Sequence, residues 1–137
     1  MSAPVSCPQI SIAGITEPII YRYFQRLNAG EFAETARLFA EDGILIAPFE
    51  EGVRGRQAIA NYLREEAPGL TAFPSQGSLE TLDDQSTRIT ITGQVQTPLF
   101  KVNVRWQFQL TNSGEIAAVE VKLLASPQEL INLRQFA

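Results

Sequence analysis

The spacing of apolar residues in the first half of the chain predicts three helices. They are expected over residues 16–28, with Thr16 as the cap, over residues 31–43, and over residues 56–66. Their apolar positions recur at intervals of three and four, which places one stripe of each helix against a core. The side chains expected on these stripes are Ile19, Ile20, Tyr23, Phe24 and Leu27, then Phe32, Ala36, Leu38 and Phe39, and then Ile59, Tyr62 and Leu63.

The second half of the chain changes to alternation with a period of two, which is typical of half-buried strands. Strands are predicted over residues 87–97, 101–110 and 116–124, after a brief strand over residues 44–47. Residues 112–114 supply a hairpin turn between the last two. The positions expected to face inward are Ile89, Ile91, Gly93 and Val95, then Val102, Val104, Trp106, Phe108 and Leu110, and then Ala117, Val119, Val121 and Leu123.

The two ends of the chain lie outside this pattern. Residues 1–14 are predicted to be a flexible lead-in, and residues 15–137 a single domain. Ser126 with Glu129 forms a capping box that predicts a short C-terminal helix. Helices followed by strands favour an α+β fold, in which helices pack on one face of a curved antiparallel sheet and enclose an apolar hollow.

The composition excludes several classes of function. The 137 residues include no histidine, which rules out His-dependent triads and most zinc sites. A net charge of −4 argues against nucleic acid as a partner. The sequence shows neither a signal-peptide pattern nor an apolar run long enough to span a membrane, so we expect a soluble, intracellular protein. Cys7, the single cysteine, is either a free thiol or a candidate for an intermolecular disulfide.

An isomerase or lyase built on this architecture would need a carboxylate inside the hollow. The pattern places none there. Asp83 and Asp84 fall in an expected turn, Glu65 and Glu66 end a helix, and Glu120 is on the outward register of its strand. Solvated positions are the expectation for all of them.

Tyr23 and Trp106 are polar aromatic residues that the periodicity turns inward, and they are better placed for a site than the carboxylates. Each combines a large apolar body with one hydrogen-bond donor. They are candidate ligand-binding residues. In the alternative, Trp106 only fills the core, with its N–H bonded to a backbone carbonyl, while Tyr23 reaches solvent.

Several motifs resemble a known family. Residues 23–29, 38–43, 48–49 and Gly55 are similar to the opening of the NTF2-like superfamily cone. More narrowly, residues 64–66, 93–98, 106–108 and 123–130 resemble the C-terminal domain of the orange carotenoid protein family. The narrowest of these matches are Val-Gln-Thr-Pro and Leu-Leu-Ala-Ser-Pro. The helical carotenoid domain of that family has no counterpart in this sequence.

The resemblance implies a cyanobacterial, cytoplasmic, non-enzymatic carrier of a ketocarotenoid of the canthaxanthin or echinenone type. Such a carrier takes up pigment during transient contact with a membrane and passes it to a helical carotenoid protein. It also quenches singlet oxygen in photoprotection. The alternatives are an isomerase or lyase acting on a small apolar substrate, and a dimerisation module whose core is packed.

The resemblance also assigns roles to residues. It implies that Tyr23 and Trp106 bind the keto oxygen of the chromophore. Glu66, Ser126 and Leu130 are candidates for partner docking or gating. The candidates for lining a pigment tunnel are Leu27, Val95, Thr97, Pro98, Leu99, Val104 and Phe108.

Size points to a shared pigment. A chain of 137 residues has an expected radius of gyration of about 14 Å, too small to enclose a whole C40 pigment beside its own core. A homodimer that shares one carotenoid is therefore expected, as the resemblance also implies. The chain departs from the family at Leu99, where an aromatic residue is common, and in a shorter segment over residues 100–106. Both lie at the expected tunnel wall.

Overall fold

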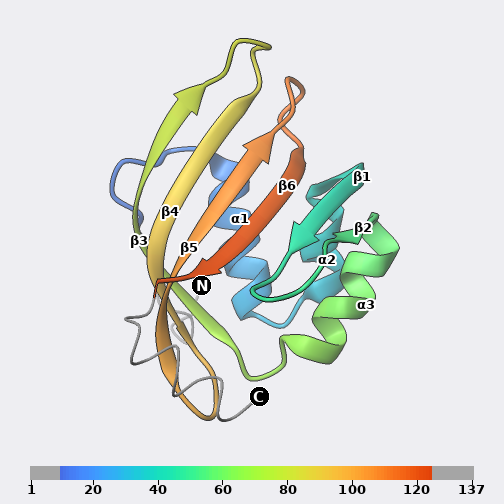
Figure 1. Cartoon of the computed structure of the whole chain (residues 1–137), viewed down its shortest axis with the longest axis vertical. Helices are drawn as coiled ribbons and strands as arrows, with labels where there is room; N and C mark the ends of the chain where they lie inside the picture. The colour runs from blue at the N-terminus through green and yellow to red at the C-terminus, as the bar shows by residue number, and fades with distance from the viewer. Residues whose placement is uncertain (1–9, 125–137) are drawn as a thin grey trace, which may run out of the picture.

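The computed structural model describes residues 10–124, in which three helices and six strands follow one another. The helices come largely before the strands, as the periodicity predicts (Figure 1). The elements are α1 (Pro18–Asn28), α2 (Phe32–Arg37), β1 (Phe39–Ile46), β2 (Val53–Arg54), α3 (Arg56–Glu66), β3 (Thr71–Thr81), β4 (Thr87–Gln96), β5 (Lys101–Leu110) and β6 (Ile116–Leu123).

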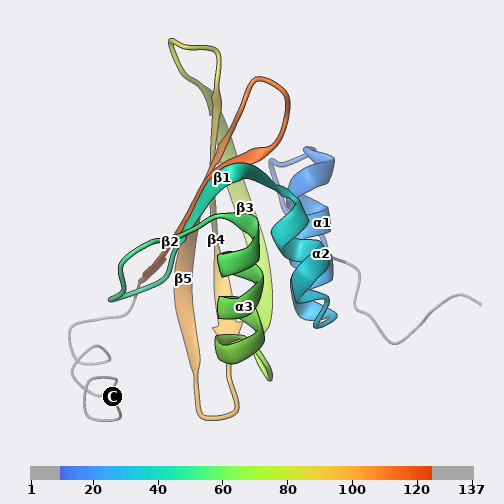
Figure 2. The ribbon, with the colours of Figure 1, turned by 90° about the vertical axis from the view of Figure 1, so that its right-hand side faces the viewer.

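The strands form one sheet in the order β2-β1-β6-β5-β4-β3. All neighbouring strands are antiparallel except β1 and β6, which run parallel. Figure 2 shows α1 and α2 stacked on one side of the curved sheet. The predicted α+β class, with helices on one face of the sheet, is confirmed.

The alternation predicted for β5 is confirmed, and it determines which residues meet the helices. Val104, Trp106, Phe108 and Leu110 are buried, whereas the residues between them are not. Trp106 lies opposite Ile91 of β4 and Val121 of β6. Side chains directly opposite in adjacent strands share a face of the sheet, so this register builds the core around Trp106.

The predicted helix over residues 31–43 is wrong in its second half. α2 ends at Arg37, and Phe39 begins β1 opposite Ile116 of β6. Leu38 and Phe39 fit a helical and an extended period equally well, and the parallel pairing with β6 decides between them. Gly43 lies within β1, where a Cβ atom would approach Phe39 and the Ile116 carbonyl to 3.0 Å, so the strand needs a glycine at this crowded position.

Residues before the expected boundary at residue 15 already pack against the fold. Ile12 is buried, and Ala13 bridges Gln76 of β3. The Tyr21 hydroxyl donates to the Ile15 carbonyl at 2.7 Å and fastens this segment to α1. The first residue of α1 is Pro18, and the cap position belongs to Glu17 rather than Thr16, without a side-chain hydrogen bond. The fixed φ of proline suits the first helical position and starts the helix here.

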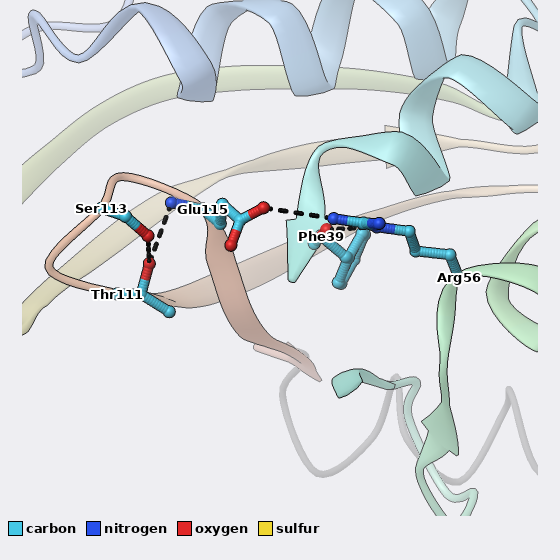
Figure 3. A network of polar contacts seen from close by, with 5 residues as sticks. All are labelled: Phe39, Arg56, Thr111, Ser113 and Glu115. Carbon is cyan, nitrogen blue, oxygen red and sulfur yellow. Dashed lines mark hydrogen bonds and ion pairs between the residues drawn. The ribbon is translucent and has the colours of Figure 1, made fainter. Parts of the chain in front are cut away.

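Arg56 connects three separate parts of the fold (Figure 3). Its Nε donates to the Phe39 carbonyl at 2.8 Å, and its Nη2 to Glu115 Oε2 at 3.1 Å. The Glu115 backbone N–H in turn donates to Thr111 Oγ1 at 3.1 Å. The guanidinium thus joins the start of α3 to β1 and to the hairpin between β5 and β6.

A bulge in β6 corrects one inward assignment. Leu110 pairs with Ile116 and Gln109 with Ala118, which leaves Ala117 as the extra residue. The buried side chain is therefore that of Ile116, and Ala117 is only partly buried.

Candidate functional site

An apolar cavity of about 210 Å³ lies between the helices and the sheet. α1 and α3 contribute one wall, and strands β1, β3, β4, β5 and β6 contribute the other. The lining residues are Tyr23, Leu27, Leu45, Ala47, Pro48, Glu50, Tyr62, Leu63, Glu66, Ala67, Leu70, Ala72, Val95, Trp106 and Val121.

Tyr23 and Trp106 both line this cavity, and each is only 2% exposed. Tyr23 enters from α1 and Trp106 from the middle of β5. The structure thus brings together the two donors that the sequence turns inward from opposite layers of the fold.

An aromatic cluster holds these two residues in place. The Phe24 ring contacts Trp106 edge-to-face with a centroid distance of 4.8 Å, and it contacts Tyr23 at 5.2 Å. Tyr23 also packs edge-to-face on Phe108 at 5.0 Å. Edge-to-face packing orients the rings as well as burying them, so the positions of both donors are fixed by residues behind the cavity wall.

Within residues 10–124, no hydrogen bond joins the Tyr23 hydroxyl or the Trp106 indole N–H to another residue, and both side chains line the cavity. The backbone carbonyl partner considered for Trp106 is therefore absent from this part of the chain, and Tyr23 does not reach solvent. Burial raises the pKa of the Tyr23 phenol well above its ordinary value, because the charged form would lose its hydration. Tyr23 is thus a neutral O–H donor at any physiological pH.

Asn28 ties the cavity wall to the end of α1. Its side-chain Nδ2 donates to the Ala72 carbonyl at 2.9 Å, and its Oδ1 accepts from the Ala72 backbone N–H at 2.8 Å. The amide thereby replaces a neighbouring strand at the edge of β3. Its neighbour Leu27 and its partner Ala72 both line the cavity.

We expect Asn28→Ala to lower the free energy of unfolding by about 2 kcal/mol, since two hydrogen bonds disappear and Ala72 keeps unpaired backbone groups. Urea denaturation followed by circular dichroism would measure the change. Asn61→Ala is the matched control, because Asn61 is exposed and its amide bonds only other exposed side chains. Equal losses in the two variants would contradict the structural role of Asn28.

The tunnel residues expected from the sequence divide into three groups. Leu27 and Val95 line the cavity. Val104 and Phe108 are buried in the core outside the lining. Thr97, Pro98 and Leu99 form the turn between β4 and β5, where Thr97 Oγ1 accepts from the Leu99 backbone N–H at 3.2 Å and Leu99 is 82% exposed.

The remaining candidate residues are also distributed unevenly. Glu66 lies at the exposed edge of the cavity lining. Cys7, Ser126, Leu130 and the predicted C-terminal helix lie outside the described residues.

The sequence did not single out Glu50 and Tyr62 as residues of the site. The Tyr62 hydroxyl donates to Glu50 Oε2 at 3.1 Å, and both residues line the cavity. The stripe of the third helix already turned Tyr62 inward, whereas no periodic signal marked Glu50. Glu50 follows Phe49, whose φ of 65° belongs to the left-handed region that side chains other than glycine rarely adopt.

Within residues 10–124, no group of three or more Cys, Asp or Glu side chains is arranged to hold a metal ion. In the same range no helix combines the length and the apolar character needed to cross a bilayer.

Comparisons with known proteins agree on the relatives of this fold. Residues 20–119 match the family model described as a SnoaL-like domain. The orange carotenoid-binding protein of a Synechocystis species is 37% identical over 143 residues, which cover 96% of this chain and 45% of that protein. The chain thus spans less than half the length of the curated relatives that it matches.

Solved structures give the same result. An orange carotenoid protein of Anabaena (Nostoc), solved binding canthaxanthin, superposes with a TM-score of 0.85 at 39% identity, covering 96% of this chain and 43% of that one. An NTF2-like protein from Novosphingobium aromaticivorans shares the fold, with a TM-score of 0.62 at 20% identity, covering 85% of this chain and 84% of that one. The predicted NTF2-like fold is confirmed.

Proposed function

Because the chain belongs to the SnoaL-like domain family and is homologous to the C-terminal domain of orange carotenoid proteins, we propose that it binds a ketocarotenoid. The observation that carries the proposal is the pair of neutral donors, Tyr23 and Trp106, in the wall of one apolar cavity. Canthaxanthin or echinenone is the type of ligand proposed, because both have a ring ketone.

The two donors match the chemistry of a ring ketone. A ketone oxygen has two acceptor lone pairs, and burying it without partners costs about 1–3 kcal/mol. The Tyr23 O–H and the Trp106 N–H would satisfy both lone pairs without bringing a charge into the cavity. The apolar lining then supplies affinity through burial of the ring, at about 25 cal/mol per Å².

The volume of the cavity sets how much of the pigment it holds. An apolar cavity of about 150 Å³ accommodates benzene. At about 210 Å³, this cavity accommodates one substituted ring but not a C40 polyene. The rest of the pigment must lie beyond the cavity, against another molecule.

A homodimer that shares one carotenoid is the arrangement we propose for the bound pigment. A helical carotenoid protein would be the acceptor, with Glu66, Ser126 and Leu130 as docking or gating candidates and Cys7 as the candidate for an intermolecular disulfide. The protein would act as a cytoplasmic, non-enzymatic carrier that contacts membranes transiently to load pigment, and the bound pigment would quench singlet oxygen.

Expression in cells that synthesise canthaxanthin tests the proposal. We expect a coloured protein whose visible band is red-shifted from that of free canthaxanthin, and much weaker colour in cells that make only β-carotene. Absorption spectra of the purified protein provide the measurement. A colourless product from the canthaxanthin strain would contradict the proposal.

Filling the cavity should abolish loading while both donors remain. Ala67 lines the cavity and is 6% exposed, so Ala67→Phe would occupy the space that the ring needs. We expect more than tenfold less pigment per protein. Overpacking a cavity costs about 1–3 kcal/mol, and a bound pigment ring would crowd the filled cavity further. Ala58→Phe, on the exposed face of α3, the helix that Ala67 caps, is the control. Circular dichroism would show that both variants are folded, and unchanged loading of the Ala67 variant would count against this cavity.

One observation favours a second candidate function. Glu50 and Glu66 contribute carboxylates to the lining, a feature that an isomerase or lyase would need. Turnover of small cyclic enones by the pigment-free protein, lost in Glu50→Gln, would establish that activity.

A further inference from the structure

The cavity runs from a buried end to an exposed rim of different chemistry. Tyr23 and Trp106 mark the buried end, at 2% exposure each. The rim consists of Glu50, Tyr62 and Glu66, of which the two carboxylates are exposed and Tyr62 is half-buried. Tyr62 and Glu66 are four residues apart on α3 and therefore share a face of the helix.

The rim carries negative charge, and no cationic side chain of the described lining offsets it. The pKa of Tyr62 is raised to about 12, first by burial, then by its hydrogen bond to Glu50, and further by the charges of Glu50 and Glu66. The Tyr62 hydroxyl therefore experiences both carboxylates. Among residues 10–124, those that line the cavity include no lysine and no arginine.

We propose that this rim makes the cavity select polyenes with an electrically neutral end over polyenes that end in a carboxylate, an inference that rests on the proposed function. When a ring ketone accepts from Tyr23 and Trp106, a short chain attached to the ring extends toward the rim. A carboxylate at the end of that chain is repelled by the two rim carboxylates. An ester or alcohol end carries no charge and is not repelled. The two neutral donors thus favour ligands with a ring ketone. The rim weakens the binding of anionic oxidation products that have the same ring.

A matched pair of ligands isolates this effect. 4-Oxo-β-ionylideneacetic acid and its methyl ester have the same ring ketone and the same chain, and they differ only in charge. Trp106 is the only tryptophan of the chain and lines the cavity, so its fluorescence reports binding of either compound. We expect the wild-type protein to bind the ester about fivefold more tightly than the acid at low salt. This ratio corresponds to the repulsion of the ligand carboxylate by two solvent-exposed carboxylates, which water partly screens.

Charge variants then identify the residues responsible. Glu50→Gln with Glu66→Gln should bring the affinity for the acid to within about twofold of that for the ester, because the two like charges that oppose the acid are removed. Glu51→Gln with Glu65→Gln is the control. These are the sequence neighbours of the rim carboxylates, both are exposed, neither lines the cavity, and the change in net charge is the same. Added salt should reduce the wild-type preference, because exposed charges are screened.

The outcomes separate this inference from the proposed function. No binding of the ester to the wild-type protein would overturn the proposed function itself. Binding of the ester together with equal binding of the acid would overturn only the role of the rim. A preference that survives in the rim variant, or that disappears equally in the control variant, would also overturn it.

Discussion

Replacing Tyr23 and Trp106 together by phenylalanine is expected to reduce the preference for canthaxanthin over β-carotene by about 10- to 100-fold. Both donors line the cavity, and the phenylalanine rings keep most of the apolar surface while removing the O–H and the N–H. A buried ketone oxygen without donors costs about 1–3 kcal/mol, and each 1.4 kcal/mol is a factor of ten in binding. Competitive loading from a mixture of the two pigments, followed by extraction and chromatography, would measure the preference.

Tyr21→Phe is the control for this experiment. The Tyr21 hydroxyl bonds backbone groups of Ile12 and Ile15, and the residue does not line the cavity. Its removal should leave the pigment preference unchanged. If the double variant kept the wild-type preference, the assignment of the keto oxygen to Tyr23 and Trp106 would be wrong, while carotenoid binding elsewhere would remain open to test.

Phe24→Ala should cause the largest loss of stability among single substitutions near the site. Phe24 is fully buried and contacts Tyr23, Trp106 and Phe108 edge-to-face. Truncating such a ring costs about 3–5 kcal/mol, a large part of the 5–15 kcal/mol that stabilises a typical domain. Urea denaturation monitored by Trp106 fluorescence would give the difference in free energy of unfolding.

Phe49→Ala is the matched control, because Phe49 is 74% exposed. A change within about 0.5 kcal/mol is expected for this surface position. Similar losses at the two positions would contradict the placement of Phe24 at the centre of the aromatic cluster.

The sequence predicted elements well where one period was unambiguous. Residues 56–66 and 101–110 agree with α3 and β5 to the residue, since each has an uninterrupted apolar stripe. The helix predicted over residues 38–43 was wrong. Leu38 and Phe39 fit either period, and the pairing of Phe39 with β6, which is distant in sequence, makes this segment a strand. The sequence also missed β3, in which Pro74, Gly77 and mostly exposed side chains hide the alternation of an edge strand.

The same reasoning explains which site residues could be predicted. Tyr23 and Trp106 lie on stripes that point inward, so periodicity alone predicted that both face the interior, where the cavity lies. Glu50 could not be found in this way, because it follows a turn with a left-handed residue and reaches the cavity only through the path of the backbone there. Leu99, a candidate for the tunnel wall, lies on the turn around Thr97 and is 82% exposed, so its role stays a prediction.

The bridge between Ala13 and Gln76 has a consequence for how copies of this protein can meet. An unpaired strand at the edge of a sheet invites a strand from another molecule. In the described part of the chain, the outer edge of β3 is blocked at Ala72 by the Asn28 amide and at Gln76 by Ala13, and β2 at the opposite edge has only two residues. Continuation of the sheet into a neighbouring copy is therefore disfavoured at both edges. A second protomer of the proposed dimer would therefore have to approach a face of the molecule, where the proposed pigment would become part of the contact.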